Sequence, residues 1–377
     1  MSNDRRQNAI DAIVCSIEHS LGGQHPPHRQ PTVRDAHPKH HGCVRAEFIV
    51  EPDLAELAPY RYGVLARPGH TYPCWVRFSN ALKSRHDLAP DARGMAVKLM
   101  DVEGAASGTQ DFLMVSHHAF FTRKAEEFVD FPAAVSGHTL SWATWGRIVA
   151  FFVRPKRREP GLAGLVALAR SLKPTWNPLA MTYFSQVPFK LGPAKLMKYC
   201  VRPHEPMPLW RRAAIRIRAL PHIVPSFNEG SPSHDMLRRA LIDRLRRDDA
   251  KFDFCVQARD VPRDSPDRTR IEDDALTGWD EGEFPYRKVA EIRIRKLEVD
   301  FDENTMMALG EHLSFTPWHN VPDHEPVGSI NEARRVVYER ISNLRHEQNR
   351  KRPLEPQSHQ TAAEYLAAID VSTTIPT

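Results

Sequence analysis

Residues 43–50 read CVRAEFIV, an apolar and β-branched run that favours a β-strand. Three similar runs follow it along the chain, each ended by a turn-rich segment: CWVRFS (74–79), MAVKLMD (95–101) and DFLMV (111–115). Further strands are predicted at 181–189, 251–257 and 288–299. Many strands at irregular spacing, with helices inserted and appended, predict an α+β fold around a mostly antiparallel sheet or closed barrel.

Helical patterns occupy the segments between and after these strands. A short N-terminal helix is predicted at about 5–20, and the loop GGQHPPHRQP (22–31) separates it from the body of the chain. The other predicted helices lie at about 124–136, 142–153, 160–172, 235–249 and 329–349, and residues 350–377 read as a polar tail.

The composition excludes several classes of protein. Of the 377 residues, 41% are hydrophobic and 26% are charged, as in soluble globular proteins, and the net charge is +5. No apolar run reaches the roughly 18 residues of a membrane helix, and residues 1–15 lack the apolar core of a signal peptide. Five scattered cysteines without a Cys-x-x-Cys motif favour reduced thiols in the cytoplasm. The basic run RPKRR (154–158) lacks interleaved aromatic residues, so no nucleic-acid partner is expected.

The predicted C-terminal helix carries ARRVVYERISNLR at 333–345. Residues four positions apart in a helix share a face, and residues seven apart are almost in line. Arg334, Tyr338 and Arg345 therefore share one face of this helix. Taken alone, the pattern is also typical of a solvated basic face with one half-buried tyrosine.

The segment VRDAHPKHHG (33–42) crowds His37, His40 and His41 beside Asp35. Three interpretations stay open from these residues alone. One is a metal site, although His-x-x-His-His matches no common structural-zinc spacing. Another is a solvated polar loop. The third is a general acid/base histidine, whose near-neutral pKa suits the transfer of a proton.

Two of the strand-like runs also carry polar groups. In VRFSN (76–80), Arg77 stands in an apolar run, where a buried charge needs a partner; it either points outward or reaches an anionic ligand. Ser79 lies two residues on, on the same face of that strand. The run TQDFLMVSHHAFF (109–121) passes into Ser116, which an ordinary strand ending in a polar turn also explains.

The order of these segments resembles that of the catalase superfamily, and in particular its small, single-domain members. The resemblance covers roughly residues 30–350 and rests on the His-x-Lys and glycine at 37–42, VRFS (76–79), DARGMAVKLM (91–100), DFLMVSHHAFF (111–121) and RRVVYERISNLR (334–345). It implies a catalase-like antiparallel β-barrel with inserted and C-terminal helices. The organisation expected from it is a helix and loop at 1–29, a haem domain at 30–350 and a polar tail at 351–377.

The resemblance implies a haem cofactor whose iron is bound by a tyrosine, as it is in catalases. Tyr338 matches that ligand, and Arg334 matches an arginine that holds the phenolate oxygen. Phe128 matches a phenylalanine that packs against the porphyrin, although a plain core aromatic would be buried in the same way.

The resemblance also implies roles for five further residues, which lie in three separate segments of the sequence. Arg34, Arg77 and Arg345 match arginines that pair with the haem propionates. His37 matches the distal histidine that takes a proton from one peroxide oxygen and returns it to the departing one. Ser79 matches a serine that orients this histidine.

One position departs from the family pattern. Ser116 stands where the family has its distal asparagine, and a serine hydroxyl reaches less far than a carboxamide. We therefore expect weaker dismutation of hydrogen peroxide than in full-length relatives. No motif supports an NADPH site, and the sequence does not choose between a monomer and a homo-oligomer.

The function implied is that of a haem-dependent oxidoreductase that reduces hydrogen peroxide or an organic hydroperoxide through a ferryl intermediate. Two alternatives stay open. One is a fatty-acid hydroperoxide isomerase or lyase of the allene oxide synthase type; Ala36, smaller than the valine usual in catalases, widens the pocket slightly and does not decide between them. The other is a haem-binding protein without turnover, which would have no need of an acid/base histidine.

Overall fold

The computed structural model of the chain describes residues 2–24, 32–34, 36–81, 87, 89–135, 142–153, 161–206 and 234–371, with a few isolated residues between 208 and 217. Within them, one antiparallel sheet contains β1 (His40–Val50), β2 (Thr71–Asn80), β3 (Arg93–Leu99), β4 (Gln110–Val115), β5 (Tyr183–Phe184), β6 (Phe189–Leu191), β7 (Lys195–Pro203), β8 (Ala250–Asp260) and β9 (Arg287–Ile294).

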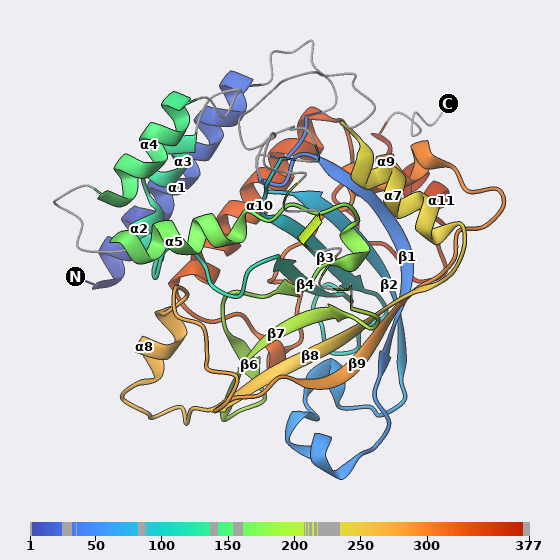
Figure 1. The fold of residues 1–377 in the computed structure, drawn as a ribbon, viewed down its shortest axis with the longest axis horizontal. Coiled ribbons are helices and arrows are strands. Elements are labelled where there is room, and N and C mark those ends of the chain that lie inside the picture. The colour runs from blue at the N-terminus through green and yellow to red at the C-terminus, as the bar shows by residue number, and fades with distance from the viewer. Residues whose placement is uncertain are drawn as a thin grey trace.

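The sheet closes on itself (Figure 1). The strand order is β5-β4-β3-β2-β1-β9-β8-β7-β6, and β5 also pairs with β7. This second pairing closes eight of the strands into a barrel and leaves β6 as an extension of β7. The α+β class and the antiparallel β-barrel predicted from the sequence are therefore confirmed.

Helices surround the barrel (Figure 1). They are α1 (Ser2–Gln24), α2 (Ala125–Phe128), α3 (Phe131–Val135), α4 (Trp142–Val153), α5 (Gly161–Ser171), α7 (Met236–Leu245), α8 (Arg268–Asp273), α9 (Glu303–His312), α10 (Ser329–Gln348) and α11 (Ala362–Ile369), with short 3-10 turns η1 (Ala55–Tyr60), η2 (Gly63–Leu65), η3 (Pro178–Ala180) and η5 (Pro322–His324). Helices α1 to α5 gather on one side, and α7, α9 and α11 lie beside β1 on another. Among the helices described here, none has both the length and the apolar character needed to cross a membrane.

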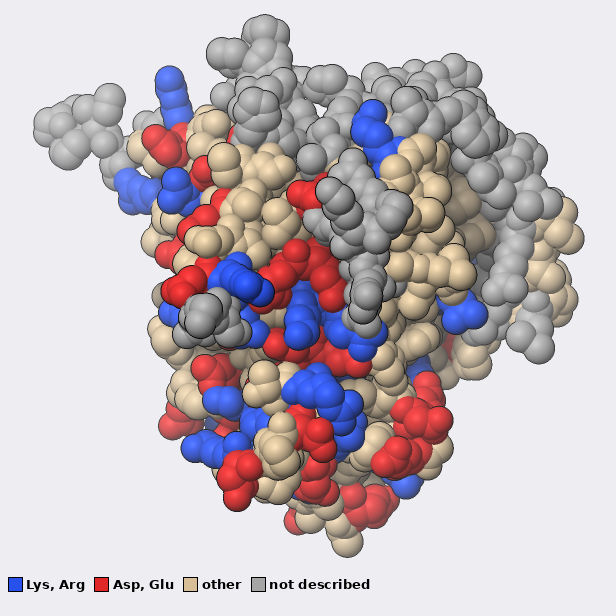
Figure 2. All heavy atoms as spheres, turned by 90° about the vertical axis from the view of Figure 1, so that its left-hand side faces the viewer, with Lys and Arg blue, Asp and Glu red and all other residues tan. Residues whose placement is uncertain are grey.

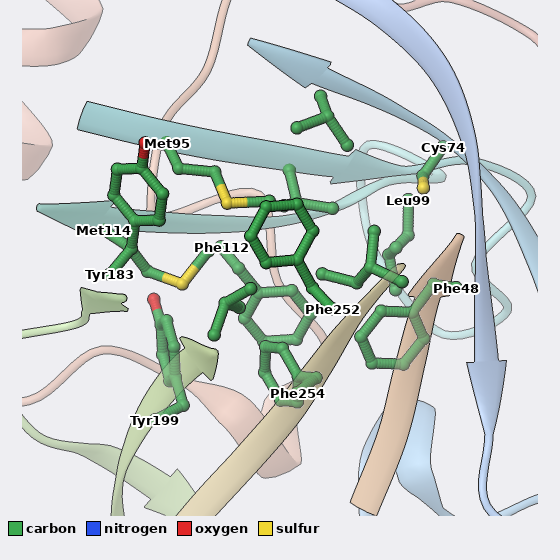
Figure 3. Close-up of a cluster of buried hydrophobic side chains, with 14 of the residues drawn as sticks. Phe48, Cys74, Met95, Leu99, Phe112, Met114, Tyr183, Tyr199, Phe252 and Phe254 are labelled. Carbon is green, nitrogen blue, oxygen red and sulfur yellow. The ribbon is translucent and has the colours of Figure 1, made fainter. Parts of the chain in front are cut away.

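The barrel interior is filled with apolar side chains and is not a pore (Figure 3). Successive side chains of a strand point to opposite faces, so every second residue of a barrel strand faces inward. The ring of Phe112 illustrates the result: its centroid lies 4.8 Å from that of Phe254 and 5.1 Å from that of Tyr199. Inward residues from seven strands meet in this core: Phe48, Cys74, Met95, Leu99, Phe112, Met114, Tyr183, Tyr199, Phe252 and Phe254.

The N-terminal helix packs along α10. Ile13 and Ile17 of α1 are buried against the apolar side of α10, which includes Val337 and Ile341. Arg6 adds ion pairs from the same helix, at 2.8 Å to Asp273 and 3.0 Å to Glu332. The helix predicted at about 5–20 therefore exists, with longer ends, and is anchored to the body by apolar and charged contacts.

Acidic and basic side chains are interleaved on the side of the molecule that carries α1 and α8 (Figure 2). Many of them are paired, for example Arg268 with Glu272 at 2.7 Å and Arg123 with Asp274 at 3.4 Å. Charges of both signs therefore cancel locally on this face, which differs from the single-sign patch that steers nucleic acid to a surface.

Two elements that were predicted to be continuous are each divided in two. The helix predicted at about 124–136 is divided into α2 and α3. Pro132 explains the division, because its ring would clash with the carbonyl of Phe128 in a continuous helix. The strand predicted at 181–189 is divided into β5 and β6, because Gln186 between them adopts a left-handed φ of 63°.

One strand and three helices of the structure were not predicted from the sequence: β7, α8, α9 and α11. The last lies in the segment that reads as a polar tail. Its Thr361 and Glu364 form a capping box, and Tyr365 and Ile369 are buried against a cluster that includes Leu309 of α9. The basic run at 154–158 lies outside the described residues.

A buried ion pair fastens this C-terminal segment to the barrel. The ammonium group of Lys98, on the outer face of β3, lies 2.8 Å from the carboxylate of Asp111 and 2.6 Å from that of Glu355. The side chains of Lys98 and Asp111 are both fully buried. These carboxylates raise the pKa of Lys98 against the opposing effect of burial, so the pair is charged in the folded protein.

We expect Lys98→Met to destabilise the protein by about 3–5 kcal/mol, because it leaves the buried Asp111 carboxylate without its cation. Urea unfolding measures the change. Arg244→Met is the matched control, since Arg244 pairs with Asp248 at 3.5 Å on the surface and such pairs contribute about 0–1 kcal/mol. Equal effects of the two substitutions would contradict the structural role assigned to Lys98.

Candidate functional site

His37 lies just before β1, at the end of the barrel where β2 finishes and β3 begins. Its Nδ1 is 3.0 Å from the hydroxyl oxygen of Ser79 on β2. The antiparallel register places Ser79 opposite Gly94 of β3, so the three residues form one corner of the barrel rim. The pairing of His37 with Ser79 expected from the family resemblance is present in the geometry. If Nδ1–H donates to Ser79, the lone pair of Nε2 is free to accept a proton.

The backbone of His37 adopts a left-handed conformation, with φ of 60°. Such a conformation costs a non-glycine residue roughly 1–3 kcal/mol and persists only where its surroundings fix it. Two hydrogen bonds do so. His37 N–H donates to the carbonyl of Ala81 at 3.2 Å, and Arg77 Nη2 donates to the carbonyl of His37 at 3.1 Å.

Gly94 makes room for the imidazole. A Cβ atom at this position would lie 2.6 Å from His37 Nδ1 and 2.7 Å from the Ser79 hydroxyl oxygen. Real Cβ atoms essentially never come so close to other heavy atoms. The glycine is therefore required by the close approach of the histidine ring, although its own backbone is ordinary.

The imidazole of His37 is held neutral. Burial, followed by the positive charges of Arg77, Arg334 and Arg34, lowers the pKa of His37 to about 3. Despite this deep position, part of the residue remains accessible. A neutral, hydrogen-bonded imidazole with accessible surface is equipped to accept a proton from a small molecule at neutral pH.

The three arginines matched to haem propionates come together at the C-terminal end of α9. Arg34 Nη1 donates to the carbonyls of Gly310 and Glu311, each at 3.0 Å, and Arg77 Nε donates to that of Gly310 at 2.8 Å. Arg345 Nη1 donates to the carbonyl of Glu311 at 2.5 Å. The last carbonyls of a helix lack intrahelical donors and carry partial negative charge, so they suit these cations.

This cluster carries more positive than negative charge. Among the described residues, Glu311 is the one carboxylate that acts on all three guanidiniums, which leaves a surplus of two positive charges. Burial and the charge of Arg34 lower the pKa of Arg345 to about 9, and the same two causes lower the pKa of Arg77. A guanidinium still remains charged at neutral pH. The cluster is therefore suited to a group with two negative charges.

Tyr338 and Arg334 face the same region from α10. Arg334 Nη2 donates to the Tyr338 hydroxyl oxygen at 3.4 Å, and Arg334 Nη1 donates to Asn331 Oδ1 at 3.2 Å. The Arg334 charge contributes to the low pKa of His37, so the two residues are near enough to interact electrostatically. The face predicted from the spacing of Arg334, Tyr338 and Arg345 thus looks toward the barrel end, whereas Val337 and Ile341 face α1.

Phe128 belongs to an aromatic cluster beside α10. Its ring centroid lies 5.8 Å from those of Phe120 and Phe121, and 5.5 Å from that of Phe131. The ring also contacts the apolar seam between α1 and α10. It is partly buried, which fits either a core aromatic or the wall of a flat cofactor.

The hydrogen bonds described for the Ser116 side chain do not connect it to His37 or Ser79. Its hydroxyl oxygen accepts from the backbone N–H of Arg93 at 3.1 Å, and its hydroxyl group donates to the carbonyl of Ser171 at 3.3 Å. Ser116 is fully buried. These bonds join the end of β4 to β3 and α5, and they occupy the hydroxyl that stands at the position of the family's distal asparagine.

His40 and His41 are buried, so the solvated-loop interpretation is wrong for them. His41 Nε2 is 2.8 Å from Asn80 Oδ1, and the ring of His40 lies against Gly310, where a Cβ would come within 2.5 Å of it. No three His, Cys, Asp or Glu side chains meet in a metal-binding arrangement within the part of the chain that the structure describes. Both histidines are packing residues around the site.

Sequence reasoning missed two parts of this arrangement. Gly94 lies in the run DARGMAVKLM, but the sequence does not show that the ring of His37 packs against it. Glu311 and the neighbouring carbonyls belong to α9, which was not predicted. The glycine in a strand was the available signal for a close approach.

Comparison with known proteins agrees with this geometry. A sequence model of the catalase family matches residues 24–141, which include His37 and Ser79 and end before α10. This N-terminal part of the chain is therefore similar in sequence to the catalase family. No curated protein matches the chain.

Solved catalases share the fold at low sequence identity. A fungal catalase is 16% identical with a TM-score of 0.61, over 94% of this chain and 65% of its own. A bacterial catalase is 18% identical with a TM-score of 0.63, over 87% and 60%. Catalase A from Saccharomyces cerevisiae is 17% identical with a TM-score of 0.59, over 94% and 67%. The chain thus spans about 60–67% of the length of these structures.

Gly94→Ala is expected to destabilise the protein by about 1–3 kcal/mol, because the new methyl group overlaps the His37 ring and the Ser79 hydroxyl. Gly146→Ala is the matched control. Nothing lies within 4 Å of a Cβ at Gly146 in α4, so alanine should stabilise that helix by about 0.5–1 kcal/mol. Urea unfolding of both variants measures the difference, and a neutral effect of Gly94→Ala would place His37 elsewhere.

Proposed function

We propose that this chain is a haem-dependent oxidoreductase that processes peroxides, of the catalase or peroxidase type. The observation that carries the proposal is the pairing of Arg334 with the Tyr338 hydroxyl, on a helix face that acts electrostatically on His37. The match of residues 24–141 to the catalase family model and the fold shared with solved catalases support it. The low identity to solved catalases means that the activity rests on the site and not on the comparison.

The side chains present fit a haem group. Three guanidiniums with one carboxylate match a ligand that brings two carboxylates of its own. A tyrosine oxygen that accepts a hydrogen bond from an arginine is suited to bind iron as an anion, because the cation stabilises its negative charge. Phe128 offers an aromatic surface beside this helix.

In this proposal, Tyr338 is the iron ligand and Arg334 its positioning cation, while Arg34, Arg77 and Arg345 bind the propionates. Haem bound in this way supplies the redox chemistry that breaks the oxygen–oxygen bond of a peroxide. The protein supplies the binding, the orientation and the proton transfers.

His37 moves the proton in the proposed reaction. Ser79 fixes the ring through Nδ1, and Nε2 takes the proton from one oxygen of the peroxide and returns it to the other as that oxygen leaves. The low pKa of His37 keeps the ring neutral and ready to accept this proton. The Ser116 hydroxyl, which is bonded to the backbone, takes no part in these steps.

The proposed substrates are hydrogen peroxide and small organic hydroperoxides. Turnover of hydrogen peroxide, a small organic peroxide and a fatty-acid hydroperoxide by the haem-loaded protein tests this choice. Rearrangement of the lipid hydroperoxide in place of reduction would replace the proposal with the allene oxide synthase alternative. All five cysteines are free, which supports a reducing cytoplasmic location as part of the proposal.

Tyr338→Phe is expected to abolish the absorption spectrum of tyrosinate-ligated haem and to weaken haem retention, because the phenylalanine ring has no oxygen to bind iron. Absorption spectra after reconstitution measure both effects. Tyr60→Phe is the control, since Tyr60 lies in the 3-10 turn η1 and should leave the spectrum unchanged. An unaltered spectrum in Tyr338→Phe would show that Tyr338 is not the iron ligand.

His37→Asn is expected to retain haem and to slow the reaction with peroxide by about 100-fold or more, since asparagine cannot carry the proton. In the parent, a His37 pKa of about 3 predicts a rate that is flat from about pH 8 to about pH 5 and falls only in stronger acid. Stopped-flow mixing with peroxide measures both. His359→Asn, at an exposed position, is the control. A midpoint near pH 6.5 in the parent would show that the imidazole is not held neutral as proposed.

A further inference from the structure

Cys200 and Cys255 lie directly opposite each other on β7 and β8. Their neighbours Tyr199 and Phe254 point into the barrel core, so both cysteines point to its outer face. Directly opposed residues of antiparallel strands have Cα atoms about 4.5–5.5 Å apart. Disulfides form across Cα separations of about 4.4–6.8 Å. The backbone therefore already holds the two thiols at a distance that a disulfide spans.

The two thiols interact with each other and with a cation. A hydrogen bond from Cys200 lowers the pKa of the Cys255 thiol, and the charge of Arg202 acts in the same direction. Burial raises the pKa of Cys200. Asp253 opposes the effect of Arg202 on Cys255, whereas Lys288 adds to it. Cys255 is therefore the more readily ionised of the pair, and Cys200 stands next to it with its proton in place.

The remaining buried cysteines differ from this pair. Burial raises the pKa of Cys43 to about 12, and burial also raises the pKa of Cys74. Thiolates are the nucleophilic form of cysteine, so Cys43 and Cys74 are expected to be inert. Cys15 is exposed on α1, and none of the other described cysteines lies opposite it as Cys200 lies opposite Cys255.

We propose that Cys200 and Cys255 form a peroxide-sensitive dithiol that closes to a cross-strand disulfide on the outer wall of the barrel. The sulfur of Cys255 attacks one oxygen of a peroxide, the oxygen–oxygen bond breaks, and the departing oxygen leaves as an alcohol or water after taking a proton. Cys255 is then a sulfenic acid. The sulfur of Cys200 displaces its hydroxyl group, which leaves as water with the Cys200 proton. The two sulfurs lose two electrons and the peroxide gains them.

The dithiol needs no haem to react. Peroxide is the oxidant that the chemistry requires, and the pair lies on the outer face of the barrel, away from the inward side of the strands. A thiol reductant of the cell reopens the disulfide by exchange, so the change is reversible.

Thiol titration of the denatured full-length protein, before and after exposure to hydrogen peroxide, tests the proposal. We expect the count to fall from the five free thiols to three, and mass spectrometry of the unreduced digest to find the Cys200–Cys255 peptide pair. The Cys74→Ser variant is the matched control and should lose two thiols as the parent does. Retention of all five thiols, or loss from other cysteines, would overturn the proposal.

Two variants test the assigned order of events. In Cys200→Ser the sulfenic acid on Cys255 has no resolving thiol, and a dione probe should label it. In Cys255→Ser the probe should not label Cys200. Labelling of Cys200 alone, or of neither variant, would overturn the mechanism. The same thiol loss in a Tyr338→Phe background would separate this site from the proposed haem chemistry, and its absence there would overturn the independence claimed above.

Discussion

Three guanidiniums meet the C-terminal carbonyls of α9, and the candidate site depends on that contact. Arg34 comes from the segment before the barrel, Arg77 from β2 and Arg345 from α10. Like charges at such close quarters repel one another, and burial removes the water that would screen them. The partial negative charge of the helix end and the carboxylate of Glu311 offset part of this cost. The C-terminal end of α9 therefore binds side chains from three distant parts of the sequence.

The closed barrel fixes the other half of the site through strand register. His40 at the start of β1 pairs with Ser79 near the end of β2, Ser79 pairs with Gly94 near the start of β3, and Gly94 pairs with Val115 at the end of β4. Antiparallel pairing therefore gathers four strand ends at one rim. A slip of one residue in any of these pairs would turn Ser79 or Gly94 to the other face and separate the histidine from its partner.

The parts of the fold that could be read from the sequence are those where one face of an element is apolar. Strands β1 to β4, β8 and β9 show this, because their inner residues fill the core and their outer residues are largely polar. Strand β7 does not: Lys198 on its outer face is buried, donating to the carbonyl of Thr277 at 3.1 Å beneath the ring of Trp279. Leu196 and Cys200 share this outer face with Lys198, so apolar and charged residues do not alternate clearly along β7. Helix α11 was missed because two anchoring residues, Tyr365 and Ile369, are few in a polar segment.

The candidate site was predictable where it consists of side chains in a fixed order. His37, Ser79, Tyr338 and the arginines are candidates because each matches a motif, and the structure brings His37 to Ser79 and Arg334 to Tyr338. The backbone parts were not predictable in this way. Every residue has a backbone carbonyl, so the sequence does not show which carbonyls at the end of α9 accept hydrogen bonds. A glycine such as Gly94 likewise does not show which ring packs against it. For Ser116 the motif was misleading, because its position in the motif does not show that its hydroxyl is hydrogen-bonded to the backbone.

The same cations that suit a dianion also set the protonation of His37. Burial lowers the pKa of His37, and the charges of Arg77, which donates to the His37 carbonyl, and of Arg334 and Arg34 lower it further. A dianion bound among these arginines would cancel much of their potential at the ring, and the pKa of His37 would then rise from about 3, although burial, the largest cause of the shift, would still keep it below its ordinary value. Binding and proton affinity are therefore coupled through the same charges. Protonation of His37 would in turn destabilise the unbound cluster by adding another positive charge to it, so the neutral histidine suits the empty anion site, whereas anion binding and protonation of His37 favour each other.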